Sequence, residues 1–219
     1  MILSVKAGKL TIPAALTGGF TGFAVYAGGG LIGFLSLVAF FVLGVLATAH
    51  KKSIKASIRA AGPHSEKRNA GQVLANGGVA ALCGILAVMD EANEQLYVLM
   101  LAASLASATA DTLSSELGMV YGRKFYNVLS FRKDRQGMDG VVSIEGTLLG
   151  IAGAAIIAAI YSLFVGFGNH FWLIVLAGTV GNLADSVLGA ALERRRFIGN
   201  DFVNFLNTLA AALVALLLY

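Results

Sequence analysis

Charged side chains are scarce in this sequence, and their scarcity excludes a soluble globular protein. Only 13% of the 219 residues are charged and 57% are hydrophobic, whereas soluble domains have about 25% charged and about 45–50% apolar residues. Only two prolines accompany 27 glycines, and the absence of a Gly-X-Y period excludes a collagen-like fibre. The apolar content excludes disorder. The class that remains is a protein that crosses a membrane several times.

Cysteine and histidine are equally scarce. Cys83 has no second cysteine to pair with and no histidine at ligand spacing, which excludes a disulfide framework and a structural zinc site. No histidine falls inside a predicted span, because His50 and His64 lie in one loop and His170 lies at the outer surface. The sequence also lacks the Walker A pattern and the common nucleophile-elbow and zinc-protease motifs.

Apolar runs of about 17–25 residues, the length that crosses a bilayer, occur repeatedly along the chain. We expect seven spans, at 11–29, 31–49, 73–90, 96–119, 140–167, 170–192 and 202–219. They use most of the chain, so residues 1–219 are expected to form a single integral membrane domain, an all-α polytopic helix bundle. The first twenty residues show no small-residue cleavage site, so we expect a first span there rather than a signal peptide.

The positions of the basic residues predict the orientation of these spans. All 16 Lys and Arg residues fall in four segments on one side: Lys6 and Lys9; Lys51, Lys52, Lys55, Arg59, Lys67 and Arg68; Arg123, Lys124, Arg132, Lys133 and Arg135; Arg194, Arg195 and Arg196. Cytoplasmic loops are rich in Lys and Arg, so we expect the N-terminus inside and the C-terminus outside, in the plasma (inner) membrane. The same residues could instead serve phosphate binding, and both interpretations stay open.

Polar residues line one face of four predicted helices, always at the cytoplasmic end. The stripes contain Ser104, Ser107, Asp111, Ser114 and Ser115; Asn182, Asp185, Ser186, Gly189 and Glu193; Asn69, Gln72 and Asn76; and Asn200, Asp201, Asn204 and Asn207. Serine and glycine can simply allow close helix packing. Asp111 and Asp185 are different, because a carboxylate inside a span is costly and by default marks a functional site. Such one-sided polarity favours a cavity open to the cytosol, and therefore an enzyme.

A basic, glycine-containing segment leads into the start of the fifth span. It contains Arg132, Lys133, Arg135, Asp139, Ser143, Gly146 and Thr147. Free backbone N–H groups and the positive end of a helix dipole, next to Arg and Lys, suit phosphate binding. Asp139 and Ser143 could equally be helix caps.

Together these groups are suited to Mg²⁺ and a polyphosphate, since Mg²⁺ prefers one or two carboxylates together with phosphate oxygens. Phosphoryl transfer depends mainly on positioning and charge neutralisation. A phosphate monoester acceptor would need no general base, because its oxygen is already nucleophilic at pH 7. An alcohol acceptor would need one, and Asp111 or Glu116 would then be the candidates.

Five segments also resemble a known family. They are RNAGQVLANG (68–77), ADTLSSELG (110–118), GMDGVVSIEGT (137–147), GNLADSVLG (181–189) and NDFVNFLNT (200–208). They are similar to those of a multi-pass membrane family of largely unknown function that includes plant chloroplast phytyl-phosphate kinase and an animal transmembrane homologue. The resemblance, together with the family's broader similarity to dolichol kinase and phosphatidate cytidylyltransferase, implies phosphoryl transfer from a nucleoside triphosphate, with CTP as the expected donor, to an isoprenoid or other lipid monophosphate.

Our hypothesis is a Mg²⁺-dependent prenyl-phosphate kinase that uses CTP or another nucleoside triphosphate at a cytosol-facing site. Asp111, Asp185 and Glu116 are the expected catalytic and metal-binding residues. The expected nucleotide- and phosphate-binding residues are Asn69, Gln72, Asn76, Arg132, Lys133, Arg135, Asp139, Ser143, Gly146, Thr147, Asn182, Ser186, Asn200, Asp201, Asn204 and Asn207. Membrane lipids and a lipid-phosphate substrate are the expected partners, and we expect no nucleic-acid partner.

Two other functions remain open. A lipid-phosphate cytidylyltransferase would use the same metal site, with attack at the α rather than the γ phosphate of CTP, and would release pyrophosphate instead of CDP. A transporter or lipid scramblase would instead move its substrate without nucleotide, and would be expected to spread polar residues through the midplane of several spans.

Overall fold

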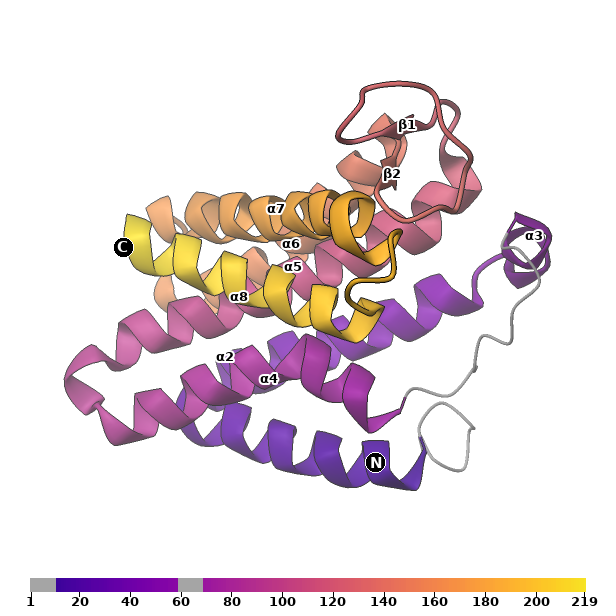
Figure 1. Ribbon diagram of the computed structural model, residues 1–219. Helices are drawn as coiled ribbons and strands as arrows, with labels where there is room; N and C mark the ends of the chain where they lie inside the picture. Colours follow the sequence, from indigo (N-terminus) through magenta and orange to yellow (C-terminus); the bar gives the residue numbers. More distant parts are fainter. Residues whose placement is uncertain (1–10, 59–68) are drawn as a thin grey trace.

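The chain is built almost entirely from long apolar helices that lie side by side (Figure 1). The computed structural model describes residues 11–58 and 69–219. Its helices are α2 (Ile12–Ala49), α3 (Lys52–Ile58), α4 (Ala70–Met89), η1 (Glu91–Asn93), α5 (Glu94–Tyr121), α6 (Ile144–Val165), α7 (Asn169–Leu188), η2 (Gly189–Glu193) and α8 (Asn200–Leu218). Two short antiparallel strands, β1 (Tyr126–Asn127) and β2 (Val141–Val142), complete it. The expected all-α polytopic bundle is confirmed.

Helix α2 is too long for a single membrane crossing. Its 38 residues would extend about 57 Å, nearly twice the bilayer's hydrocarbon core of about 30 Å. Gly30 interrupts it with φ 52° and ψ −141°, a conformation that a Cβ disfavours. The first half runs away from the N-terminal end and the second half returns beside it (Figure 1). Six helices in the described ranges have the length and composition of membrane spans. When the two halves of α2 on either side of Gly30 are counted separately, the structure has one helical segment for each of the seven predicted spans.

One predicted span boundary that differs from the structure is the start of α6. The sequence predicts a span from residue 140, whereas the helix begins at Ile144. Gly140 has a positive φ of 71°, and the Ser143 Oγ accepts a hydrogen bond from the Gly146 N–H at 3.1 Å. This cap starts the helix at its observed position, because it satisfies one of the free N–H groups of the first turn.

Helix α5 forms the centre of the bundle. It packs against α2, α4, α6, α7 and α8, and every residue from Val98 to Ala110 is buried. Its small residues let neighbouring helices approach closely. A Cβ added to Gly181 of α7 would lie 2.8 Å from the Ser107 Cβ of α5. This close approach brings the polar ends of α5 and α7 together.

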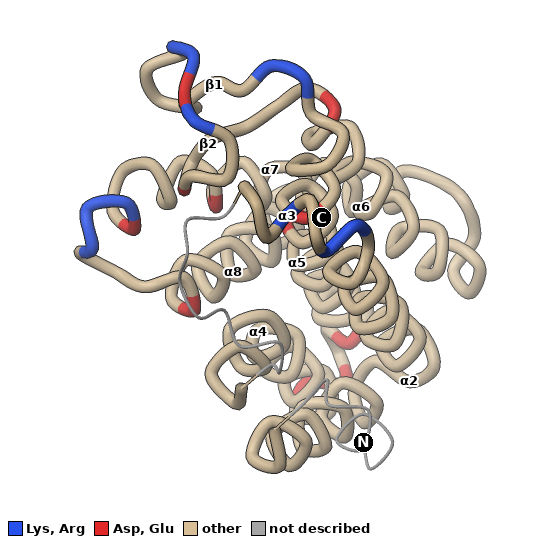
Figure 2. Tube along the Cα trace, turned by 90° about the vertical axis from the view of Figure 1, so that its right-hand side faces the viewer, with Lys and Arg blue, Asp and Glu red and all other residues tan. Residues whose placement is uncertain are grey.

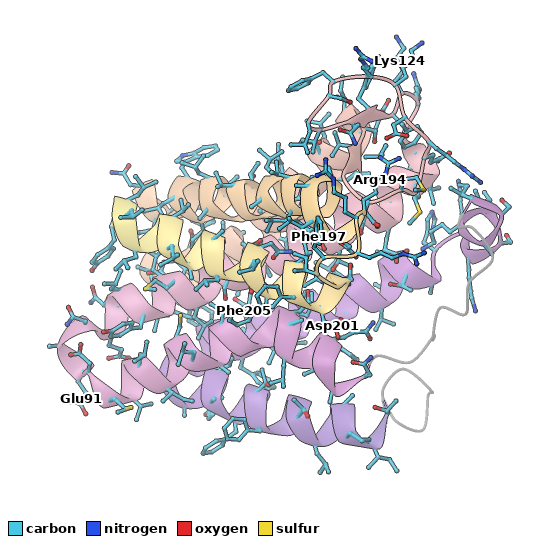
Figure 3. The ribbon with its side chains drawn as sticks, in the orientation of Figure 1. Glu91, Lys124, Arg194, Phe197, Asp201 and Phe205 are labelled. Atoms are coloured by element: carbon cyan, nitrogen blue, oxygen red, sulfur yellow. The ribbon has the colours of Figure 1, made fainter. Side chains whose placement is uncertain are left out.

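The two ends of the bundle differ in charge. All described Lys and Arg residues lie in the α2–α3 region, the α5–α6 connection and the α7–α8 connection, which meet at one end of the bundle (Figure 2). The opposite end carries the acidic residues Asp90, Glu91 and Glu94, and Figure 3 shows Glu91 far from Lys124 and Arg194. Lys6, Lys9, Arg59, His64, Lys67 and Arg68 lie outside the described residues. That the basic end faces the cytosol stays a prediction.

Candidate functional site

A cavity of about 780 Å³ opens within the basic end of the bundle. Helices α2, α4, α5, α7 and α8 contribute to its wall, together with the segment that joins α5 to α6. Thirteen of the sequence-predicted site residues line it: Gln72, Asn76, Asp111, Glu116, Arg135, Asp139, Ser143, Asn182, Asp185, Ser186, Asn200, Asp201 and Asn204. The fold therefore brings together residues that are as much as 132 positions apart in the sequence, from 72 to 204.

The other predicted residues lie outside the cavity lining. Asn69 caps the start of α4 and forms a capping box with the lining residue Gln72, with hydrogen bonds of 2.9 and 3.0 Å. Thr147 donates a hydrogen bond to the Ser143 carbonyl at 3.0 Å, and Gly146 packs against Gly118. Arg132 and Lys133 are exposed on the α5–α6 connection. Asn207 is fully buried and is hydrogen-bonded to the lining residue Asp185.

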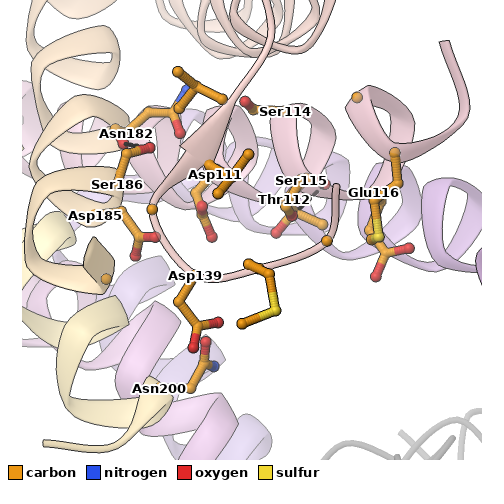
Figure 4. A pocket seen from close by; sticks show the side chains of 18 of the residues that line it. Asp111, Thr112, Ser114, Ser115, Glu116, Asp139, Asn182, Asp185, Ser186 and Asn200 are labelled. Carbon is orange, nitrogen blue, oxygen red and sulfur yellow. Dashed lines mark hydrogen bonds between the residues drawn. The ribbon is translucent and has the colours of Figure 1, made fainter. Parts of the chain in front are cut away.

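Asp111 and Asp185 form the floor of the cavity (Figure 4). Asp111 comes from α5 and Asp185 from α7, and Figure 4 shows their side chains beside one another. The Asn207 Nδ2 donates a hydrogen bond to the Asp185 Oδ1 at 2.7 Å, and the Ser107 hydroxyl donates to the Asn207 Oδ1 at 3.1 Å. This chain of bonds fixes the orientation of the Asn207 amide, and through it the rotamer of Asp185.

Two further amides face the same region. Asn182 lies one helical turn before Asp185 and is only 4% exposed, and among the described residues its side chain has no hydrogen-bond partner. A Cβ added to Gly150 would lie 2.7 Å from the Asn182 Nδ2, so the glycine leaves space for this amide. The Asn204 Oδ1 accepts from the Asn207 Nδ2 at 3.4 Å. Both Asn182 and Asn204 line the cavity, so their amides can contact a bound ligand.

Glu116 is held by a lysine that the sequence analysis did not assign to the site. The Lys55 Nζ lies 2.5 Å from the Glu116 Oε2, and the two side chains are 2% and 11% exposed. The same ammonium donates to the carbonyls of Ala47 at 2.8 Å and Thr48 at 2.7 Å. Figure 4 shows Glu116 apart from Asp111 and Asp185. Its metal-binding role stays a prediction, while its observed role is to anchor α3.

The α5–α6 connection covers one side of the cavity. A Cβ added to Gly140 would lie 2.5 Å from the Ala190 backbone nitrogen, so the connection contacts η2 directly. This contact places Asp139 near Glu193, a lining residue at the end of the π-helical turn η2. Burial raises the pKa of Asp139 above its ordinary value, although the Arg194 guanidinium opposes the shift. Glu193 was visible in the sequence on the same helical face as Asp185, yet it was not among the predicted site residues.

An ion pair fastens this connection to the end of α7. The Arg194 Nη1 lies 2.5 Å from the Asp134 Oδ2, and the hydrogen bond from Arg194 lowers the pKa of Asp134 to about 2. The folded pKa lies below the ordinary value of 3.8. The contact therefore stabilises the observed position of the connection at pH values above 3.8 and is lost as the pH falls through about 2.

We expect Asp134→Asn to accelerate trypsin cleavage after Arg132 and Lys133 by about 2- to 5-fold at neutral pH, the range of an exposed ion pair. The reason is that the variant lacks the ion pair through which Arg194 holds the α5–α6 connection in place. Timed digestion followed by mass spectrometry measures the rate. Asp90→Asn, the same substitution at the opposite end of the bundle, is the matched control, and equal rates in both variants would contradict the anchoring role.

The charges of the lining indicate the kind of ligand that fits. Asp111, Glu116, Asp139, Asp185, Glu193 and Asp201 line the cavity, whereas Lys52 and Arg135 are its basic lining residues in the described ranges. No group of three or more His, Cys, Asp or Glu side chains in the described ranges is placed to hold a metal by itself. The floor offers two carboxylates and an amide, all with oxygen donors. Such a set fits Mg²⁺ only when a phosphate ligand supplies further oxygens.

Comparisons with known proteins agree with a membrane family. The family model described as integral membrane protein DUF92 matches residues 1–212. Protein VTE6, chloroplastic, of Arabidopsis thaliana is 30% identical over 197 residues, which are 86% of this chain and 59% of that protein. An uncharacterized membrane protein of Methanocaldococcus jannaschii is 36% identical over 190 residues, covering 84% of this chain and 74% of its own length.

A cyanobacterial relative is also a membrane protein. An uncharacterized membrane protein of Synechocystis is 29% identical over 199 residues, covering 89% of this chain and 77% of its own length. The alignment with VTE6 spans less than two thirds of that protein. No solved structure matches the chain.

Proposed function

The chain belongs to the DUF92 family of integral membrane proteins, and we propose that it is a nucleotide-dependent kinase that converts an isoprenoid or other lipid monophosphate to the diphosphate. The observation that most directly supports this proposal is the pair of Asp111 and Asp185 on the floor of a cavity at one end of the helix bundle. The resemblance of five segments to the family of phytyl-phosphate kinase supports the reaction type. Similarity to VTE6 is consistent with it.

Asp111 and Asp185 would hold Mg²⁺, with the Asn182 amide as a further oxygen donor. When bound, the ion would neutralise charge on the phosphates and help to orient them. Asn207 keeps the Asp185 carboxylate turned toward the cavity. Gln72 and Asn76 of α4 and Asn204 of α8 also line the cavity, where their amides would bind phosphate or nucleotide oxygens.

The transfer itself needs little from the protein beyond positioning. An oxygen of the acceptor monophosphate attacks the γ phosphorus of the donor, the bond from that phosphorus to the β–γ bridging oxygen breaks, and the nucleoside diphosphate leaves with the electron pair. A dianionic acceptor has no proton to give up, so no general base is required. Among the residues that the structure describes, no histidine lines the cavity.

The setting of the cavity fits a substrate that is part lipid. Apolar residues line it beside the polar floor, among them Val45 and Ala49 of α2 and Met119 of α5. We propose that the phosphate end of the acceptor reaches the floor while its chain stays among the helices in the bilayer. The clustering of basic residues at the same end of the bundle supports a site on the cytosolic side of the membrane.

Product analysis tests this function. Purified protein with Mg²⁺, CTP and a short prenyl monophosphate should release CDP and form the prenyl diphosphate, and ATP and GTP serve as alternative donors. Release of pyrophosphate with a CDP-linked lipid would instead establish a cytidylyltransferase. Flux of lipid phosphate across proteoliposomes without any nucleotide turnover would establish a transporter.

A further inference from the structure

Of the three basic residues expected from sequence to bind phosphate, Arg135 alone lines the cavity. Arg132 and Lys133 do not line it. The basic side chains that line it, within the described ranges, are Lys52 at the first position of α3 and Arg135 on the α5–α6 connection. A triphosphate bound at an acidic floor needs positive charge around its remaining oxygens, and these two residues belong to different walls.

Lys52 belongs to a helix that is firmly attached to the rest of the site. Lys55, one turn further along α3, is bonded to Glu116 of α5 and to two carbonyls at the end of α2. Just before α3, the His50 Nε2 and the Tyr121 hydroxyl are hydrogen-bonded at 2.8 Å. The Lys51 ammonium lies 4.9 Å from the centre of the Tyr121 ring. These contacts join the start of α3 to the end of α5, the helix that carries Asp111.

On the basis of the proposed kinase function, we propose that Lys52 binds the phosphates of the nucleoside triphosphate and that Lys55 is a positioning residue for it. Lys52 and Lys55 are separated by one turn of α3, so the anchor formed by Lys55 and Glu116 fixes the backbone from which Lys52 extends. Arg135 supplies a second cation from the α5–α6 connection. The nucleotide is the assigned ligand because its several phosphates can extend from the Asp111 and Asp185 floor to a cation on the α3 wall.

Equilibrium binding of radiolabelled CTP with Mg²⁺, together with steady-state kinetics, tests the role of Lys52. Lys52→Ala should raise the Kd and KM for the nucleotide by about 10- to 100-fold, the equivalent of one hydrogen-bonded charge contact, with a smaller change in kcat. Lys52→Arg should retain most of the affinity. Lys124→Ala, which removes the same charge from an exposed position away from the cavity lining, is the matched control.

A double-mutant cycle tests the positioning role of Lys55. The variant Lys55→Met with Glu116→Gln removes both charges of the anchor and keeps Lys52. We expect weaker nucleotide binding in this variant, and a smaller additional loss when Lys52→Ala is combined with it than in the wild-type background. Fully additive losses would show that Lys55 does not act through Lys52.

The outcomes separate this inference from the function on which it rests. If the wild-type protein binds none of CTP, ATP and GTP, both are overturned. If it binds nucleotide but Lys52→Ala matches Lys124→Ala, only the assignment of Lys52 is overturned. If Lys52→Ala raises only the KM for the lipid phosphate, the assignment to the nucleotide is likewise overturned, and Lys52 binds the acceptor instead.

Discussion

Asp185→Asn should reduce turnover by at least about 100-fold while the helix bundle remains folded. The estimate follows from metal sites in which removal of a supporting residue already costs about 10- to 100-fold, since Asp185 is proposed to contact the ion directly. Asparagine keeps the shape of the side chain and can still accept the hydrogen bond from Asn207. The loss therefore reports charge rather than packing. Initial rates with saturating nucleotide and acceptor measure it, and Asp111→Asn should behave alike.

Two further variants serve as comparisons for the loss of turnover in Asp185→Asn. Asp90→Asn changes an acidic residue outside the cavity lining and should leave turnover unchanged. Asn207→Ala removes the residue that orients Asp185, and should lower turnover by about 10- to 100-fold, less than the loss of the carboxylate itself. Full activity in either Asp111→Asn or Asp185→Asn would remove that residue from the reaction.

Lys55→Met should lower the free energy of unfolding by about 3–5 kcal/mol, the cost of breaking a buried ion pair from one side. The substitution removes the Lys55 ammonium from the buried Glu116 carboxylate and from the carbonyls of Ala47 and Thr48 at the end of α2. Unfolding by a denaturing detergent in mixed micelles, followed by circular dichroism, measures the loss.

The double variant Lys55→Met with Glu116→Gln tests whether the remaining charge of Glu116 causes the loss of stability. It removes both charges of the Lys55–Glu116 pair, so most of the lost stability should return. Arg195→Ala removes a basic residue that is exposed and makes no salt bridge in the described ranges, and should change stability little. If Lys55→Met proves as stable as Arg195→Ala, the pair does not anchor α3.

The arrangement of the spans could be predicted from sequence because two independent signals agree. Apolar length gives the number of crossings, and the positions of the basic residues then assign their ends. The run of glycines at 28–30 was enough to separate the first two spans, and the structure breaks α2 at Gly30. Helical periodicity likewise placed Asp111, Asn182 and Asp185 on polar faces, and helix packing brings these faces to one cavity.

Contacts made by the connecting segments could not be predicted in the same way. The path of the α5–α6 connection depends on the positive φ angles of Gly137 and Gly140 and on the pair of Asp134 and Arg194. That path leaves Arg132 and Lys133 outside the cavity lining. The burial of Lys55 depends on the turn after α2, and its sequence neighbours give no sign of it. Helical periodicity describes one helix at a time, so it does not predict which distant segments pair with one another.

Thermal stabilisation by nucleotide tests the proposed metal-dependent nucleotide site most directly. A ligand that binds the folded state raises the melting temperature by mass action. We predict that Mg²⁺ with CTP, or with one of ATP and GTP, stabilises the detergent-purified wild-type protein, and that the shift disappears without Mg²⁺ and in Asp185→Asn. An equal shift in wild type and Asp185→Asn, or no shift with any nucleotide, would contradict the site.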